Sequence, residues 1–249
     1  MNTRIKYLLL VIFLFIIPLF VKDQFYLHLF TMTLFNSILA LSLSLIMTTG
    51  QLSIGHAAFM GTGAYTVAIL TMRLNLSFWI ALPLAGVMAA ALAILIGRLT
   101  LRIKGAYFAI ITFAFGEIVR QIWVNWVSLF GGVNGIINIP QVDPISIPGL
   151  FRMDFNAKGN FYLLTLVVAI LAVWVMHRMR SSQFGRIFHS ISEADQLTEC
   201  LGVNIMNYKI LAFATGCFFA GLVGGLFSPY FRYINPSSFT FVQSVEFII

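Results

Sequence analysis

The longest polar stretch, residues 178–207, reads RMRSSQFGRIFHSISEADQLTECLGVNIMN and interrupts a chain that is otherwise almost entirely apolar. Within it, apolar residues recur at steps of three and four, the spacing that gathers side chains on one helical face. These residues are Ile187, Ile191, Ala194, Leu197 or Thr198, and Leu201. Ser190 or Ser192 is expected to cap the start, and Gly202 stands where a left-handed stop belongs. The stretch predicts a short amphipathic helix between two membrane spans.

The composition is that of a polytopic membrane protein. Hydrophobic residues make up 60% of the chain, charged residues 9%, and the mean hydropathy is +0.95, whereas globular proteins carry about 25% charged residues. The net charge of +7 does not indicate nucleic-acid binding, because the basic residues are scattered at the ends of apolar runs. Cys200 and Cys217 have no metal-ligand spacing. We therefore expect an all-α fold in which residues 1–249 form one transmembrane domain surrounded by lipid.

Apolar runs of bilayer length predict about seven complete transmembrane helices and the start of another. The predicted spans are residues 7–21, 29–49, 52–72, 78–97, 106–127, 161–177 and 210–227, followed by an apolar run from residue 239. The first is expected to be a retained helix, because no small-residue cleavage site follows it. The last run is too short to cross a bilayer, so we expect the chain to be incomplete at its C-terminus.

Basic residues set the expected orientation. If the spans alternate, nine basic residues lie on one side, near the N-terminus, around residues 98–104 and in residues 178–209, and five lie on the other. The N-terminus and residues 178–207 are then cytoplasmic. A cytoplasmic amphipathic helix suits docking into a groove of a peripheral protein. Its polar face carries Glu193, Asp195 and Glu199, whereas helices that lie on a membrane surface favour Lys and Arg there.

Two intramembrane features leave alternatives open. Residues 50–65, GQLSIGHAAFMGTGAY, form either a tightly packed helix with small-residue contacts or a broken helix beside a translocation path. Full alternation of the spans favours a crossing helix over a re-entrant one. Glu117 and Arg120 lie three residues apart on one helical face. They are read as a structural ion pair in preference to a proton-coupling site.

Four motifs resemble the branched-chain amino-acid permease family of bacterial ABC importers, in its second-subunit branch. They are GQLSIGHAAFMGTGAY, GAYFAIITFAFGEIVR, GGVNGI and SISEADQLTECLGVNIMNYKILAFATGCFFAGLVGGL. The resemblance implies a multi-pass permease of the bacterial inner membrane, for branched-chain amino acids or, in similar permeases, urea, short amides or other amino acids. It also implies as partners a second homologous permease subunit, two cytoplasmic ATPase subunits and a periplasmic substrate-binding protein.

The resemblance also implies roles for particular residues. ATPase coupling would fall to Gly185, Glu193, Ala194, Asp195, Leu201 and Gly202, with Asp195 standing where the family pattern has alanine. The translocation path would be lined by residues of the glycine-rich segments and their neighbours. These residues are Gln51, Gly55, His56, Gly61, Tyr107, Glu117 and Asn134.

No catalytic constellation is visible in the sequence. It contains neither a phosphate-binding G-x-x-x-x-G-K-[ST] loop nor a G-x-S-x-G elbow. We expect a transport subunit that is not an enzyme and binds no cofactor, with ATP used by a partner chain. The alternative from a different class is a secondary transporter driven by an ion gradient, for which Glu117 is the leading ionisable group.

Overall fold

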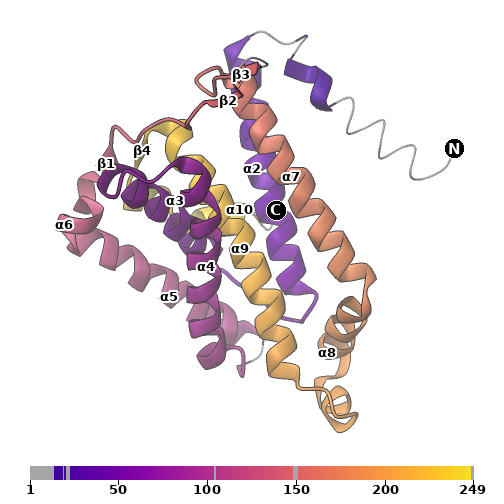
Figure 1. The fold of residues 1–249 in the computed structure, drawn as a ribbon. Coiled ribbons are helices and arrows are strands. Elements are labelled where there is room, and N and C mark those ends of the chain that lie inside the picture. Colours follow the sequence, from indigo (N-terminus) through magenta and orange to yellow (C-terminus); the bar gives the residue numbers. More distant parts are fainter. Residues whose placement is uncertain (1–13, 19, 21–22, 104, 148–150, 248–249) are drawn as a thin grey trace, which may run out of the picture.

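The structure is a computed structural model that describes residues 14–18, 20, 23–103, 105–147 and 151–247. Long helices dominate it and run between two opposite ends of a bundle (Figure 1). From residue 23 on, the described part of the chain forms the α-helices α2 Gln24–Met47, α3 His56–Arg73, α4 Phe78–Thr100, α5 Ala106–Asn125, α6 Val127–Phe130, α7 Lys158–Ser181, α8 Gln183–Cys200, α9 Ile205–Phe231 and α10 Phe241–Glu246.

Five helices of the described part of the chain, α2, α4, α5, α7 and α9, are long and apolar enough to cross a membrane. They confirm five of the predicted spans with shifts at the ends. Helix α2, for example, begins earlier than predicted, because Asp23 caps it by accepting a hydrogen bond from the Phe25 N–H at 2.9 Å. The predicted count of seven is not confirmed. Most of residues 7–21 lies outside the described residues, and residues 52–72 are not one continuous helix.

Helix α9 lies at the centre of the bundle, where its glycines admit three neighbouring helices. It packs against α3 and α4 on one side and α2 on the other, and α2 also pairs with α7. A methyl group on Gly216 would press on the Ser42 carbonyl of α2, and one on Gly221 on the Ala85 carbonyl of α4. One on Gly224 would overlap the Met60 carbonyl of α3. These glycines of α9 thus let the helix backbones approach closely without interdigitating side chains, as in other membrane helix pairs.

Residues 130–160, predicted as a loop, contain short regular elements at the end of the bundle away from α8 (Figure 1). These are η1 Gly132–Asn134, β1 Ile136–Ile137, β2 Ile145–Ile147 and β3 Phe151–Met153. Strand β2 pairs antiparallel with β3, and β1 pairs antiparallel with β4 Tyr233–Ile234, which follows α9. Asp143 fastens this interval to α4, because its Oδ2 accepts the Phe78 N–H at 2.8 Å and the Ser77 hydroxyl at 2.7 Å.

After β4, the chain turns back into the bundle. The short η2 Pro236–Ser238 leads to α10, which contacts α3 and α5. Ser244 of α10 is fully buried there. The apolar run predicted from residue 239 thus contains, over its described residues, a six-residue helix that contacts α3 and α5 and buries Ser244, while Phe241 and Val242 stay exposed.

Candidate functional site

Helix α8 is the polar element that the sequence predicts, but it starts earlier and bends. Its N-cap is Ser182, whose hydroxyl accepts the Phe184 N–H at 3.2 Å. The predicted caps Ser190 and Ser192 are wrong: both lie inside the helix, and their hydroxyls donate to the Arg186 and His189 carbonyls. The helix extends back to Gln183 because α7 ends in a sharp turn just before it.

Two glycines shape the ends of α8. At Gly185 a methyl group would overlap the Arg180 carbonyl, so glycine allows α8 to fold closely against the end of α7. Gly202 has φ +82° and ends the helix as predicted. Its N–H donates to the Glu199 carbonyl at 2.9 Å, and the Val203 N–H reaches the Thr198 carbonyl at 3.4 Å.

A kink at Ala194 divides the predicted apolar face of α8. Ala194 has φ −152° and ψ 78°, outside the helical range. Ile191 before it and Thr198 after it are buried, whereas Leu197 is 69% exposed and Leu201 84% exposed. The prediction that one stripe faces a single surface is therefore wrong beyond the kink. The bend turns two leucines outward at the tip of the element.

Helix α8 also lies against the segment that follows α2. A cavity of about 210 Å³ separates them, lined by Thr49, Gly50, Gln51, Ile191, Ser192, Glu193, Asp195 and Lys209. Gly50 has φ +76°, and a methyl group on it would lie 3.4 Å from the Ser192 Cα. Glu193 is exposed, while Asp195 is half-buried and Lys209 is buried at 5% exposure. Because of this contact, a displacement of α8 would also move the segment that leads into α3.

That segment, residues 50–55, is irregular and enters the protein interior before α3 begins at His56. Backbone N–H groups of this segment and of the first turn of α3 find partners on distant helices. The Ile54 N–H donates to the Thr112 hydroxyl of α5 at 3.1 Å, and the Ala57 N–H donates to the Ser244 hydroxyl of α10 at 2.8 Å. An irregular backbone inside a membrane protein needs such partners, because lipid offers none.

Several side chains at this break are buried with polar atoms left over. His56 is fully buried, and its Nε2 lies 2.7 Å from the Ser42 hydroxyl of α2. Its Nδ1 has no hydrogen-bond partner, nor do the Gln51 Oε1 and the Ser53 hydroxyl. Burying an unpaired polar group costs about 1–3 kcal/mol. Three such groups lie close to the start of α3, and buried polar groups without a protein partner are commonly satisfied by ordered water.

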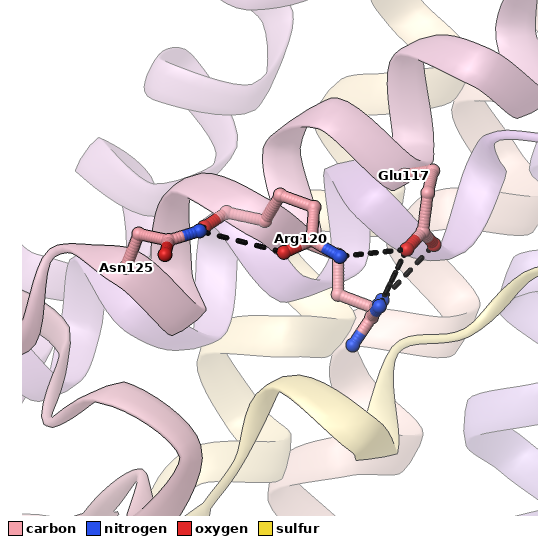
Figure 2. A network of polar contacts seen from close by, with 4 residues as sticks. Glu117, Arg120 and Asn125 are labelled. Carbon is pink, nitrogen blue, oxygen red and sulfur yellow. Dashed lines mark hydrogen bonds and ion pairs between the residues drawn. The ribbon is translucent and has the colours of Figure 1, made fainter.

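Helix α5 carries a polar stripe on an open face. Glu117 and Arg120 form an ion pair with Nε–O distances of 3.0 Å, and Gln121 donates to Glu117 at 3.3 Å (Figure 2). Asn125 continues the stripe by donating to the Gln121 carbonyl at 2.8 Å. The side chains of Glu117 and Arg120 are 42% and 25% exposed. The sequence reading of a structural ion pair agrees with this geometry.

The polar stripe faces a broad open hollow of about 570 Å³ whose other walls are Phe113, Ala114, Ile118 and Ile122. Of the five candidate spans, α5 is buried least within the protein. Charged and amide groups are costly against lipid, so this face suits a water-filled path or a protein partner. The inner edge of the stripe meets the break before α3: Glu117 lines a narrow crevice together with Gly55 and Ser244.

Comparison with known proteins fits these features. The sequence model of a family described as "Branched-chain amino acid transport system / permease component" matches residues 25–249. The chain belongs to this family. The resemblance drawn from the four motifs is confirmed.

Two curated relatives illustrate the range of the family. The high-affinity branched-chain amino acid transport system permease protein LivM of Escherichia coli K12 is 34% identical over 238 residues, which cover 86% of this chain and 55% of LivM. The autoinducer 2 import system permease protein LsrC of Escherichia coli O9:H4 is 26% identical over 246 residues, which cover 94% of this chain and 66% of LsrC. The chain thus spans about half the length of LivM. No solved structure gives a significant match.

Within the described structure, the residues predicted to line a path fall into separate places. Gln51, Gly55 and His56 gather at the break before α3, and Glu117 joins Gly55 at the crevice. Three others lie elsewhere. Gly61 packs against the Trp123 and Phe239 rings, Tyr107 is 72% exposed at the start of α5, and Asn134 is exposed in η1.

The sequence did not predict which side chains would hydrogen-bond to the residues around the start of α3. Ser42, Thr112 and Ser244 supply hydroxyl groups to His56, Ile54 and Ala57 from three different helices. In the sequence they are single hydroxyl residues inside apolar runs, indistinguishable from others that bond to their own helix. Only the tertiary arrangement identifies them.

Proposed function

We propose that this protein is a permease subunit of an ATP-driven importer for branched-chain amino acids. LivM, the relative at 34% identity, carries that substrate in its name, and LsrC, at 26%, carries autoinducer 2. The substrate proposal therefore rests on the higher similarity. Urea, short amides or other amino acids are the alternative cargo, and a panel of labelled solutes distinguishes them.

The proposed assembly places the permease in the bacterial inner membrane with its N-terminus and α8 on the cytoplasmic side. A second homologous permease subunit pairs with it, two ATPase subunits bind from the cytoplasm, and a periplasmic binding protein delivers substrate at the opposite end. The polar stripe of α5 then faces the second subunit across the path, which explains why its polar groups stand on an open face. The chain itself binds no nucleotide or cofactor.

The observation that carries the coupling role is the outward turn of Leu197 and Leu201 at the tip of α8. Two large apolar side chains exposed on a polar element at a bundle end suit insertion into a groove on a partner. Glu193 and Asp195 give the element negative charge, and Gly202 ends its helix. Together with Gly185 and Ala194 they form the proposed coupling element.

The proposed mechanism transmits movement of the ATPase through α8. Closure of the ATPase pair pushes α8, which lies against Gly50 and Gln51. That segment leads to the break before α3, where the capping contacts to Thr112 and Ser244 have to yield if the path is to open. The partly unpaired polar atoms around His56 are the place where solute or water passes.

A secondary transporter is less well supported. That class needs a proton- or ion-coupling group inside the membrane. Glu117 is the leading one, and it is held by two Nε contacts at 3.0 Å from Arg120. A carboxylate so engaged suits a fixed structural role.

Co-purification tests the proposal. The full-length protein is isolated from its own membranes in mild detergent, and bound proteins are identified by mass spectrometry. We expect a P-loop ATPase and a second permease, and we expect Glu193→Ala and Gly202→Ala to release the ATPase but keep the second permease. Gln196→Ala, on an exposed position of the same helix, is the control. A homo-oligomer without any nucleotide-binding partner would contradict the proposal.

A further inference from the structure

A second cavity, away from the path, lies at the end of the bundle opposite α8. It occupies about 340 Å³ where α2 and α7 begin and α9 ends. Its walls include His28 of α2, Asn156 and Lys158 at the start of α7, Phe161 of α7, and Tyr230 and Phe231 of α9. In Figure 1 this region lies on the other side of α9 from α5. The proposed coupling element and the polar stripe therefore do not account for it.

One wall of this outer cavity is aromatic. The rings of Phe161 and Tyr230 lie 4.9 Å apart, and His28 stacks on Tyr230 at 5.6 Å with an interplanar angle of 7°. His28 Nδ1 lies 2.7 Å from the Tyr230 hydroxyl, which fixes both rings. Phe231 adds an edge-on ring 5.2 Å from Tyr230. Aromatic faces attract ammonium groups, and the C-terminal end of α9 adds negative partial charge beside them.

The opposite wall is positive. Lys158 is half-buried, and within the described residues its ammonium group makes no hydrogen bond or ion pair. Helix α7, which it opens, has no side-chain cap and no acidic residue in its first turn, so its positive end is uncompensated. The nearby carboxylate, Asp154, accepts hydrogen bonds from the Asn156 backbone at 3.0 Å and the Asn156 amide at 3.1 Å and does not line the cavity. This wall favours an anion, and Lys is a good point-charge partner for phosphate.

We propose that the outer cavity binds the headgroup of a zwitterionic phospholipid. The phosphodiester lies at Lys158 and the start of α7, and the ammonium group lies against the aromatic wall. The cavity stands at the ends of three candidate spans, the level at which headgroups lie. Phe25 and Leu29, 66% and 51% exposed, flank His28 on α2 and offer an apolar surface to the acyl chains. A free amino acid shares the charge pattern but would not use this surface.

Amine labelling of the wild-type protein in detergent tests the site without any substitution. Lys158 is acetylated with and without dihexanoylphosphatidylcholine, whose headgroup has no reactive amine, and the modified peptide is quantified by mass spectrometry. We expect labelling of Lys158 to fall about tenfold. A hydrogen bond to a charged group contributes about 1.5 kcal/mol or more, and 1.4 kcal/mol corresponds to a tenfold change in occupancy. Dihexanoylphosphatidylglycerol, which lacks the ammonium group, should protect less, and leucine should not protect at all.

No protection by the choline lipid, or equal protection by leucine, would overturn the proposal. Equal protection by the glycerol lipid would overturn the role given to the aromatic wall. A variant pair provides an independent readout: phospholipid retained after purification should fall in Lys158→Gln and stay unchanged in Arg232→Gln. Arg232 carries the same charge at the same end of the bundle but does not line the cavity. Equal lipid retention in both variants would also overturn the proposal.

Discussion

Gly224 shows how a single residue decides the packing of this permease. It sits where α9 crosses α3, and a methyl group there would overlap the Met60 carbonyl, which belongs to a helix backbone and cannot turn aside. The same holds on the other side of the crossing, where Gly63 meets the backbone of Gly221. At these positions glycine allows the two backbones to pack closely. In lipid, where no hydrophobic effect drives helices together, such close packing stabilises helix association.

We predict that Gly224→Ala destabilises the protein by about 1–3 kcal/mol, the usual cost of overpacking. Gly116→Ala is the matched control, because its methyl group would meet its nearest neighbours at 3.6 and 3.7 Å, an ordinary contact distance. Unfolding of the purified protein by heat or denaturing detergent measures both. Equal stability of the two variants would show that the crossing is looser than described.

The Glu117–Arg120 pair makes a second prediction at this scale. Arg120→Gln leaves an unpaired carboxylate on α5, whereas Glu117→Gln with Arg120→Gln leaves none, so the double variant should be the more stable of the two. The coupling energy should be about 1 kcal/mol, as for polar pairs in other membrane proteins. A double-mutant cycle on unfolding measures it. Additive effects of the two substitutions would argue against a structural pair.

Among the elements, α8 shows what local sequence predicts and what it does not. The helix and its end at Gly202 were predictable, because both depend on local sequence. The apolar residues recur with helical spacing, and the glycine adopts φ +82°, which favours glycine and ends the helix. The kink at Ala194 was not predictable, because alanine favours a continuous helix and no residue in the local sequence marks a bend there. The cap was misplaced for a related reason: Ser182, Ser190 and Ser192 look alike in sequence, and the end of α7 selects the first.

The break before α3 illustrates the same limit. Glycines in residues 50–55 indicated loosened helix, but the caps Thr112 and Ser244 come from elements 58 and 187 residues away in the chain. The five spans were predictable since each needs only a run of apolar residues. Which hydroxyl on which span meets an open backbone group depends on the three-dimensional arrangement alone.

We predict that Leu197→Ser and Leu201→Ser, together, weaken binding of the ATPase at least about tenfold without lowering the stability of the permease. Losing two exposed apolar anchors from an interface costs more than 1.4 kcal/mol when they are hot spots. Gln196→Ser and Glu199→Ser, exposed on the same helix, form the matched control. ATPase binding is measured by pull-down with purified subunits. Unchanged binding of the leucine variant would remove α8 from the interface.

On the scale of the whole molecule, the proposed orientation has a natural probe. Cys200 is exposed on α8, whereas Cys217 is buried in α9. A membrane-impermeant maleimide should label Cys200 in inside-out membrane vesicles and leave it unlabelled in spheroplasts. Asn156→Cys, at the opposite end of the bundle, should show the reverse in a background without Cys200. Labelling of Cys200 from the outside would invert the topology and place α8 beyond the reach of an ATPase.

The central claim is that ATP hydrolysis by a partner drives solute through this permease. Its most direct test is uptake of labelled leucine into proteoliposomes that contain the purified complex, binding protein outside and ATP inside. We predict uptake that persists when ionophores collapse all ion gradients and stops when ATP is replaced by a non-hydrolysable analogue. Uptake that follows an imposed proton or sodium gradient without ATP would contradict the account and return attention to Glu117.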